Sequence, residues 1–90
     1  IICLSHLGYK YDNLPNRVCD YNLAKKSNHI DLIIGGHTHT FMEKPVVLKN
    51  ERGNDVIINQ VGCFGLYLGQ IDFFFDRNNK RSFNSNLINI

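Results

Sequence analysis

The pattern of apolar and polar residues divides the chain into a mixed first part and a second part of strands alone. Residues 1–5 (IICLS) and 30–36 (IDLIIGG) are short apolar runs, which are typical of buried strands. Between them, residues 17–29 (RVCDYNLAKKSNH) repeat apolar side chains at about helical spacing from Val18 onward, which predicts a helix of about three turns. The order strand, helix, strand predicts two parallel strands joined by a crossover.

The second part of the chain alternates apolar runs with turn residues. Residues 45–50 and 56–62 flank the segment ERGND, which predicts a hairpin. Residues 66–76 predict a further strand, in which Gly69 is a candidate bulge, and residues 81–90 predict an edge strand. We therefore expect an α/β fold, with a short parallel β-α-β unit followed by an antiparallel β-meander.

Composition narrows the class of protein without naming a function. The 90 residues are enough for one small domain, and a net charge of +2 gives no reason to expect a nucleic-acid polymer as partner. No apolar run reaches the ~20 residues that a transmembrane helix needs, so we expect no membrane span. The three cysteines, Cys3, Cys19 and Cys63, are widely spaced and form no C-x-x-C pair, which indicates ordinary thiols.

Three histidines follow the two strands of the parallel unit. His6 comes directly after the first strand, and His37 and His39 follow the second in the segment IIGGHTHT. Because the carboxyl ends of parallel strands meet at one sheet edge, we expect these side chains to converge there as metal ligands. In an extended segment His37 and His39 would point the same way, toward two metals about 3.5–4 Å apart, with Thr38 as a spacer.

Two other polar residues near the same strand have structural explanations. His29 lies near the predicted C-terminus of the helix, where an imidazolium interacts favourably with the helix dipole. Asp31 lies just before the second strand and is expected to be a turn residue and not a ligand.

These motifs resemble a known family. GGHTH at residues 35–39 looks like the G-H-x-H motif of the calcineurin-like metallophosphoesterases, and LSHLG at residues 4–8 resembles the histidine motif that precedes it. The segment HIDLIIGGHTHT, followed by IINQVGCFGLYLGQIDFFFD, is most similar to the metallophosphatase domain of bacterial 5'-nucleotidases. The resemblance covers residues 1–76 and implies a partial four-layer α/β/β/α sandwich.

The resemblance implies a dinuclear metal site for phosphoester hydrolysis. It assigns His6 and His37 to the second metal and His39 to the first, with zinc, manganese or iron as the expected ions. A metal-activated water would attack the phosphorus of a nucleotide or related phosphoester. Gln60 and Gly62, in the segment NQVG, would lie near the metals and are weak candidates for substrate contacts.

Several motifs of that family have no match in this chain. It contains no D-x-H, no GD metal motif and no GNH, so of the expected metal ligands only the histidines are present. We therefore expect residues 1–90 to be the C-terminal portion of a metallophosphatase domain whose N-terminal half is missing, and to be poorly active alone. By the same resemblance, the whole protein is expected to be periplasmic or exported in bacteria.

Two alternatives stay open. The chain could be a non-catalytic remnant that binds a partner, or a single zinc with an open fourth position, through the same histidines. It could also be a structural module with incidental histidines.

Overall fold

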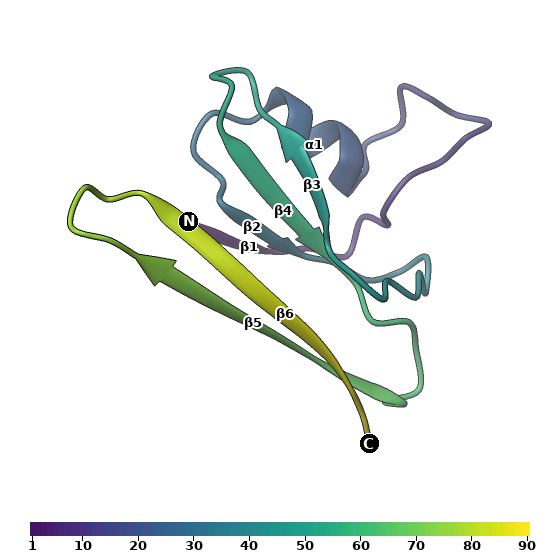
Figure 1. Cartoon of the computed structure of the whole chain (residues 1–90). Coiled ribbons are helices and arrows are strands. Elements are labelled where there is room, and N and C mark those ends of the chain that lie inside the picture. Colours follow the sequence, from purple (N-terminus) through teal and green to yellow (C-terminus); the bar gives the residue numbers. More distant parts are fainter.

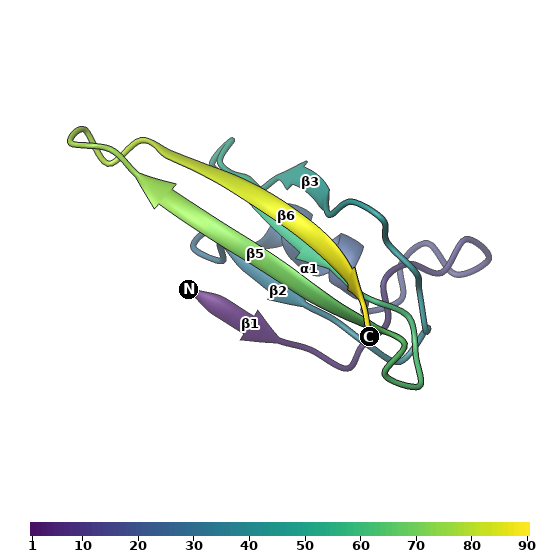
Figure 2. The same cartoon turned by 60° about the horizontal axis from the view of Figure 1, so that its bottom comes forward.

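Three layers make up the structure, a computed structural model that describes residues 1–90. A helix, α1 (Asp20–Lys26), covers one face of a four-stranded sheet, and a two-stranded hairpin lies over the opposite face (Figures 1 and 2). The sheet has the order β1-β2-β4-β3, and the hairpin consists of β5 and β6. The strands are β1 (Ile2–Leu4), β2 (Leu32–Ile34), β3 (Val46–Lys49), β4 (Asp55–Asn59), β5 (Tyr67–Phe75) and β6 (Arg81–Asn89).

The predicted α/β class and the parallel β-α-β unit are confirmed. β1 and β2 pair in parallel with α1 between them, and β2 pairs in parallel with β4 on its other side. The hydrophobic core lies between the sheet and α1. Its buried members are Ala24, Ile33, Met42, Val56 and Ile58.

The predicted hairpin forms as β3 and β4, but the two later strands pair with each other in a separate sheet, so the predicted single meander is wrong. β4 has β2 on one side and β3 on the other, so neither of its edges is free for β5. The chain therefore crosses to the second layer after β4. Gly69 is not a bulge, because it pairs with Leu87 in an unbroken register. A Cβ at Gly69 would lie 2.8 Å from Val61 Cγ1, so close packing explains the glycine.

The helix is shorter than predicted, and a different face of it is buried. It has seven residues, and Val18 lies before it with 68% of its surface exposed. The backbone amides of Asp20 and Tyr21 donate to the carbonyls of Gly8 and Tyr9, so the start of the helix is attached to the preceding loop. With the helix attached in this way, the Asp20 side chain is buried, whereas Val18, which the helical spacing placed on the apolar face, is exposed. No helix in the structure has the length and apolar character needed to cross a membrane.

The first strand is less buried than its apolar sequence predicts. Ile2 and Leu4 are 63% and 78% exposed, whereas Leu32 and Ile33 of the next strand are buried. β1 is an edge strand with β2 as its one partner, so nothing covers its outer side.

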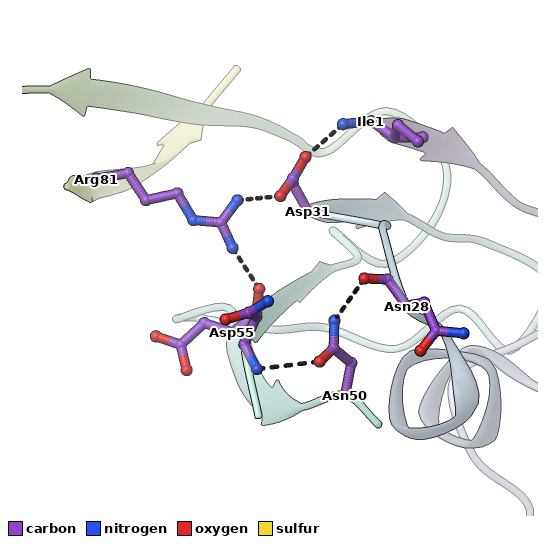
Figure 3. Close-up of polar contacts among 7 residues, drawn as sticks. Ile1, Asn28, Asp31, Asn50, Asp55 and Arg81 are labelled. Atoms are coloured by element: carbon purple, nitrogen blue, oxygen red, sulfur yellow. Dashed lines mark hydrogen bonds and ion pairs between the residues drawn. The ribbon is translucent and has the colours of Figure 1, made fainter. Parts of the chain in front are cut away.

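The hairpin is connected to the sheet by a polar clasp (Figure 3). Arg81, the first residue of β6, pairs with Asp31 just before β2 and donates to the carbonyl of Asp55 at 2.5 Å. Asp31 also binds the Ile1 ammonium. Partial burial raises the pKa of Asp31, but the hydrogen bonds and charges of the Ile1 ammonium and Arg81 outweigh it and hold that pKa below its ordinary value.

Space remains between the two sheets. One cavity of about 770 Å³ lies beside the clasp, and a second of about 470 Å³ lies between the apolar residues of β2 and β5. The larger cavity has none of the predicted histidine ligands in its lining. The smaller cavity has none of them in its lining either, so the predicted ligands lie outside both cavities.

Candidate metal centre

Three strands end at the same edge of the sheet, where the sequence predicted two. Leu4, Ile34 and Asn59 lie side by side in the register of β1, β2 and β4. The hydrogen bonding continues one residue further, because the Ser5 amide donates to Ile34 O and the Gly35 amide donates to Asn59 O, both at 2.9 Å. The segments that carry His6, His37 and Gln60 therefore leave the sheet together.

His6 and His37 form a close pair at this edge. His6 Nε2 lies 3.3 Å from His37 Nδ1, and the ring centroids are 5.1 Å apart. Two imidazole nitrogens that bind one tetrahedral metal ion at ~2.0–2.1 Å are separated by about 3.3 Å. Both side chains are exposed, so an ion from solvent can reach them. The observed spacing is that of a hydrogen bond between the two rings, and it also fits two ligands of a single ion.

Gly36 lies beside this pair. A Cβ built at that position would lie 3.4 Å from His6 Nδ1, which is an ordinary van der Waals contact. The His6 imidazole therefore packs against the backbone of Gly36, and an alanine there would fit beside it.

His39 lies apart from the pair. The extended conformation expected for this segment is wrong, because His37 and His39 have φ values of 72° and 52°, in the left-handed region. The alternation of side chains along a strand does not apply there. The ring of His39 instead lies 6.3 Å from that of Phe64, which also has a positive φ. The structure contains no group of three or more His, Cys, Asp or Glu side chains arranged to hold a metal ion.

Thr38 is more than the spacer that we expected. Its Oγ1 accepts a hydrogen bond from the Tyr9 amide at 3.0 Å and lies 2.8 Å from Thr40 Oγ1. Gln60, which is 2% exposed, binds the same loop: its Oε1 accepts from the Thr40 amide at 2.5 Å, and Thr38 Oγ1 lies 3.3 Å from its amide group. The two threonines of HTHT therefore attach the histidine loop to the end of β4. In the sequence, the alternation of histidine and threonine over residues 37–40 is the feature that could have indicated this structural role.

The candidate substrate residues have structural roles in this chain. The Gln60 side chain is already engaged in the histidine loop, and Gly62 has a φ of +79°, with the Phe41 ring where a side chain would be. Substrate contacts by Gln60 and Gly62 stay predictions. His29 lies away from the pair and is 3.4 Å from Arg52 Nη1.

Sequence reasoning missed Asp20. Its side chain is fully buried beneath the edge, and Oδ1 accepts a hydrogen bond of 2.5 Å from Ser5 Oγ. Burial raises the pKa of Asp20 above its ordinary value, and the hydrogen bond from Ser5 offsets this only in part. An acidic residue in the first turn of a helix is usually solvated, so the sequence pattern carried no sign of its burial.

Known proteins similar to this chain share one activity class. It is 46% identical over 76 residues to the trifunctional nucleotide phosphoesterase protein YfkN of Bacillus subtilis, with 84% of this chain and 4% of that protein covered. It is 30% identical over 89 residues to the 5'-nucleotidase of Rattus norvegicus, with 84% and 14% covered. The crystal structure of a 5'-nucleotidase precursor from Thermus thermophilus superimposes with a TM-score of 0.71 at 25% identity, covering 79% and 17% of the two chains.

This chain belongs to the 5'-nucleotidase family. No family model matches it, so the assignment rests on these relatives. The match confirms both the family resemblance and the α/β fold expected from the sequence. The chain spans less than a fifth of the length of each of these 5'-nucleotidase relatives.

Proposed function

We propose that this chain supplies part of a two-metal site in a nucleotide phosphoester hydrolase. The observation that carries the proposal is the 3.3 Å separation of His6 Nε2 and His37 Nδ1, in a chain of the 5'-nucleotidase family. Divalent ions in such sites neutralise charge on phosphoryl oxygens and lower the pKa of bound water. Imidazole ligands favour zinc, manganese or iron.

The residues of the chain have separate tasks in this proposal. His6 and His37 hold one ion between them, and His39 is assigned to the other. Gln60 and Thr38 fix the loop between the two histidine positions, so that the ligands are oriented before an ion arrives. Preorganised ligands of this kind avoid paying the ordering entropy on binding.

The remaining ligands are proposed to come from residues outside these 90. Two histidines leave a tetrahedral ion half coordinated, and the structure holds no third ligand beside them. We therefore expect the isolated chain to bind metals weakly and to hydrolyse phosphoesters poorly. Export of the whole protein belongs to the same proposal and is supported by relatives such as the snake venom 5'-nucleotidase of Gloydius brevicauda, at 30% identity.

A single-ion site is the second candidate. It is favoured by one observation, that His39 lies apart from the His6–His37 pair. In this case the chain would bind one zinc ion and have no hydrolytic role. The metal stoichiometry of the full-length protein separates the two functions.

His37→Ala in the full-length protein tests the proposal. The variant should lose bound metal and lower metal-dependent hydrolysis of a nucleoside monophosphate by more than about 100-fold, because even outer partners of metal ligands contribute 10–100-fold. Elemental analysis should give two ions per wild-type chain. His29→Ala is the matched control, since that exposed histidine lies against Arg52, away from the pair. Full activity and metal content in His37→Ala would refute the assignment.

A further inference from the structure

Asp20 is the charged side chain that the structure buries completely, and it lies against the residues that precede His6 and His37. It comes from the start of α1, yet its carboxyl group contacts the ends of both β1 and β2. We propose that Asp20 is a positioning residue that sets the geometry of His6 and His37 for the metal. This inference rests on the proposed function.

One carboxylate oxygen controls the segment that carries His6. Ser5 Oγ donates to Asp20 Oδ1 at 2.5 Å and accepts from the Leu7 amide at 3.2 Å, so His6 lies at the centre of a turn closed by the Ser5 hydroxyl. The Asp20 backbone amide donates to Gly8 O at 2.8 Å. Side chain and backbone of the same residue therefore hold both ends of the turn around His6.

The other oxygen faces the segment that carries His37. Asp20 Oδ2 is buried and has no hydrogen-bond partner. It occupies the space that a Cβ on Gly35 would take, far inside van der Waals contact. Gly35 is held from its far side by the hydrogen bond from its amide to Asn59 O. The backbone two residues before His37 is thus fixed between Asp20 and β4.

Asp20 and Gln60 hold the site through different partners. Gln60 binds Thr38 and Thr40, so it holds the loop after His37 and on both sides of His39. Asp20 contacts Ser5, directly before His6, and Gly35, two residues before His37. Residues that orient metal ligands contribute about 10–100-fold to metal affinity, and this is the effect expected of Asp20.

The test measures Co²⁺ affinity of the metal-free full-length protein by titration of the visible absorption of the bound ion. Asp20→Ala and Ser5→Ala should each weaken Co²⁺ binding by about 10–100-fold. Asp20→Asn should stay within about 3-fold of wild type, because its amide oxygen still accepts from Ser5 and its shape is retained. The matched control is Asp12→Asn, an exposed acid in the same loop, which should leave the affinity unchanged.

A double variant separates positioning from general support of the fold. If Asp20 acts through Ser5, the combination of Asp20→Ala and Ser5→Ala should bind no more weakly than Asp20→Ala alone. Melting temperatures measured beside the titrations identify variants that only lose stability. Where Asp20→Ala fails to fold, Ser5→Ala and Asp20→Asn decide the question.

The outcomes distinguish this inference from the proposed function. Wild-type affinity in Asp20→Ala or in Ser5→Ala would overturn the role of Asp20, while loss of Co²⁺ binding in His37→Ala would still support the metal site. Absence of Co²⁺ binding in the wild-type protein would overturn both.

Discussion

Gly35→Ala should destabilise the protein through one steric conflict. A Cβ at residue 35 would overlap Asp20 Oδ2, which is buried beneath the sheet edge. The φ angle of Gly35 is not in the left-handed region, so backbone strain plays no part in the effect. The substitution therefore measures how tightly Asp20 is held against β2.

The loss of stability depends on whether the backbone or the Asp20 side chain moves to accommodate the new methyl group. The backbone is restrained, because the Gly35 amide is bound to Asn59 O and the Ser5 amide to Ile34 O, each at 2.9 Å. Forcing an extra methyl group into such a site costs ~1–3 kcal/mol. If the Asp20 side chain yields instead, its buried oxygen loses the Ser5 hydrogen bond, which costs ~1–3 kcal/mol. In either case we expect the free energy of unfolding to fall by ~1–3 kcal/mol.

Urea-induced unfolding of the full-length protein, followed by circular dichroism, provides the assay. Gly36→Ala is the matched control, because its Cβ would meet His6 Nδ1 at 3.4 Å, an ordinary contact, and should cost less than ~1 kcal/mol. Adding Asp20→Ala to Gly35→Ala removes the overlap, so the pair should be less destabilising than the sum of the two. Equal unfolding midpoints for Gly35→Ala and Gly36→Ala would refute the reasoning.

Two further predictions concern the clasp and the histidine loop. Arg81→Ala should lower the free energy of unfolding by less than ~1 kcal/mol, with Lys80→Ala as control, because the ion pair to Asp31 is partly exposed. In the 90-residue chain, where Ile1 carries a terminal ammonium, the pKa of Asp31 is lowered by folding, so its contribution is present above its unfolded pKa and is lost as the pH falls through the folded pKa. Urea midpoints of that chain from pH 6 to pH 2 should therefore fall less in Asp31→Asn than in wild type, and parallel curves would contradict this. Gln60→Ala should cost ~1–3 kcal/mol and speed hydrogen exchange of the Thr40 amide, since a partly buried donor loses its acceptor. A raised KM with unchanged stability and exchange would instead support a substrate contact by Gln60.

Local patterns identified the framework of this protein. The apolar runs around residues 1–5 and 30–36, with a helical stretch between them, indicated a parallel unit, and the structure has it. Because parallel strands end at the same edge, the sequence also placed the histidines of the two strand ends together. His6 and His37 meet there. Spacing along the chain is enough for such predictions, because strand direction follows from the order of the elements.

Two features could not be predicted from the sequence: the backbone conformation of the histidine loop and the pairing of β4 with strands on both sides. Nothing in the letters HTHT shows that His37 and His39 adopt positive φ, and this local geometry turns His39 toward Phe64. The separation of the two hairpins depends on β4 having both edges occupied, which is a property of the whole sheet.

The sequence by itself predicted which residues carry the chemistry, and the tertiary structure decided which side chains hold those residues in place. The sequence carried no sign that Asp20 is buried and suggested only a substrate contact for Gln60, but folding buries both side chains under the strand ends that bear the histidines. Burial removes water as a hydrogen-bond partner, so each side chain must find protein partners. Those partners lie 15 or more residues away, at Ser5 and at Thr38 and Thr40, and only the folded chain brings them within reach.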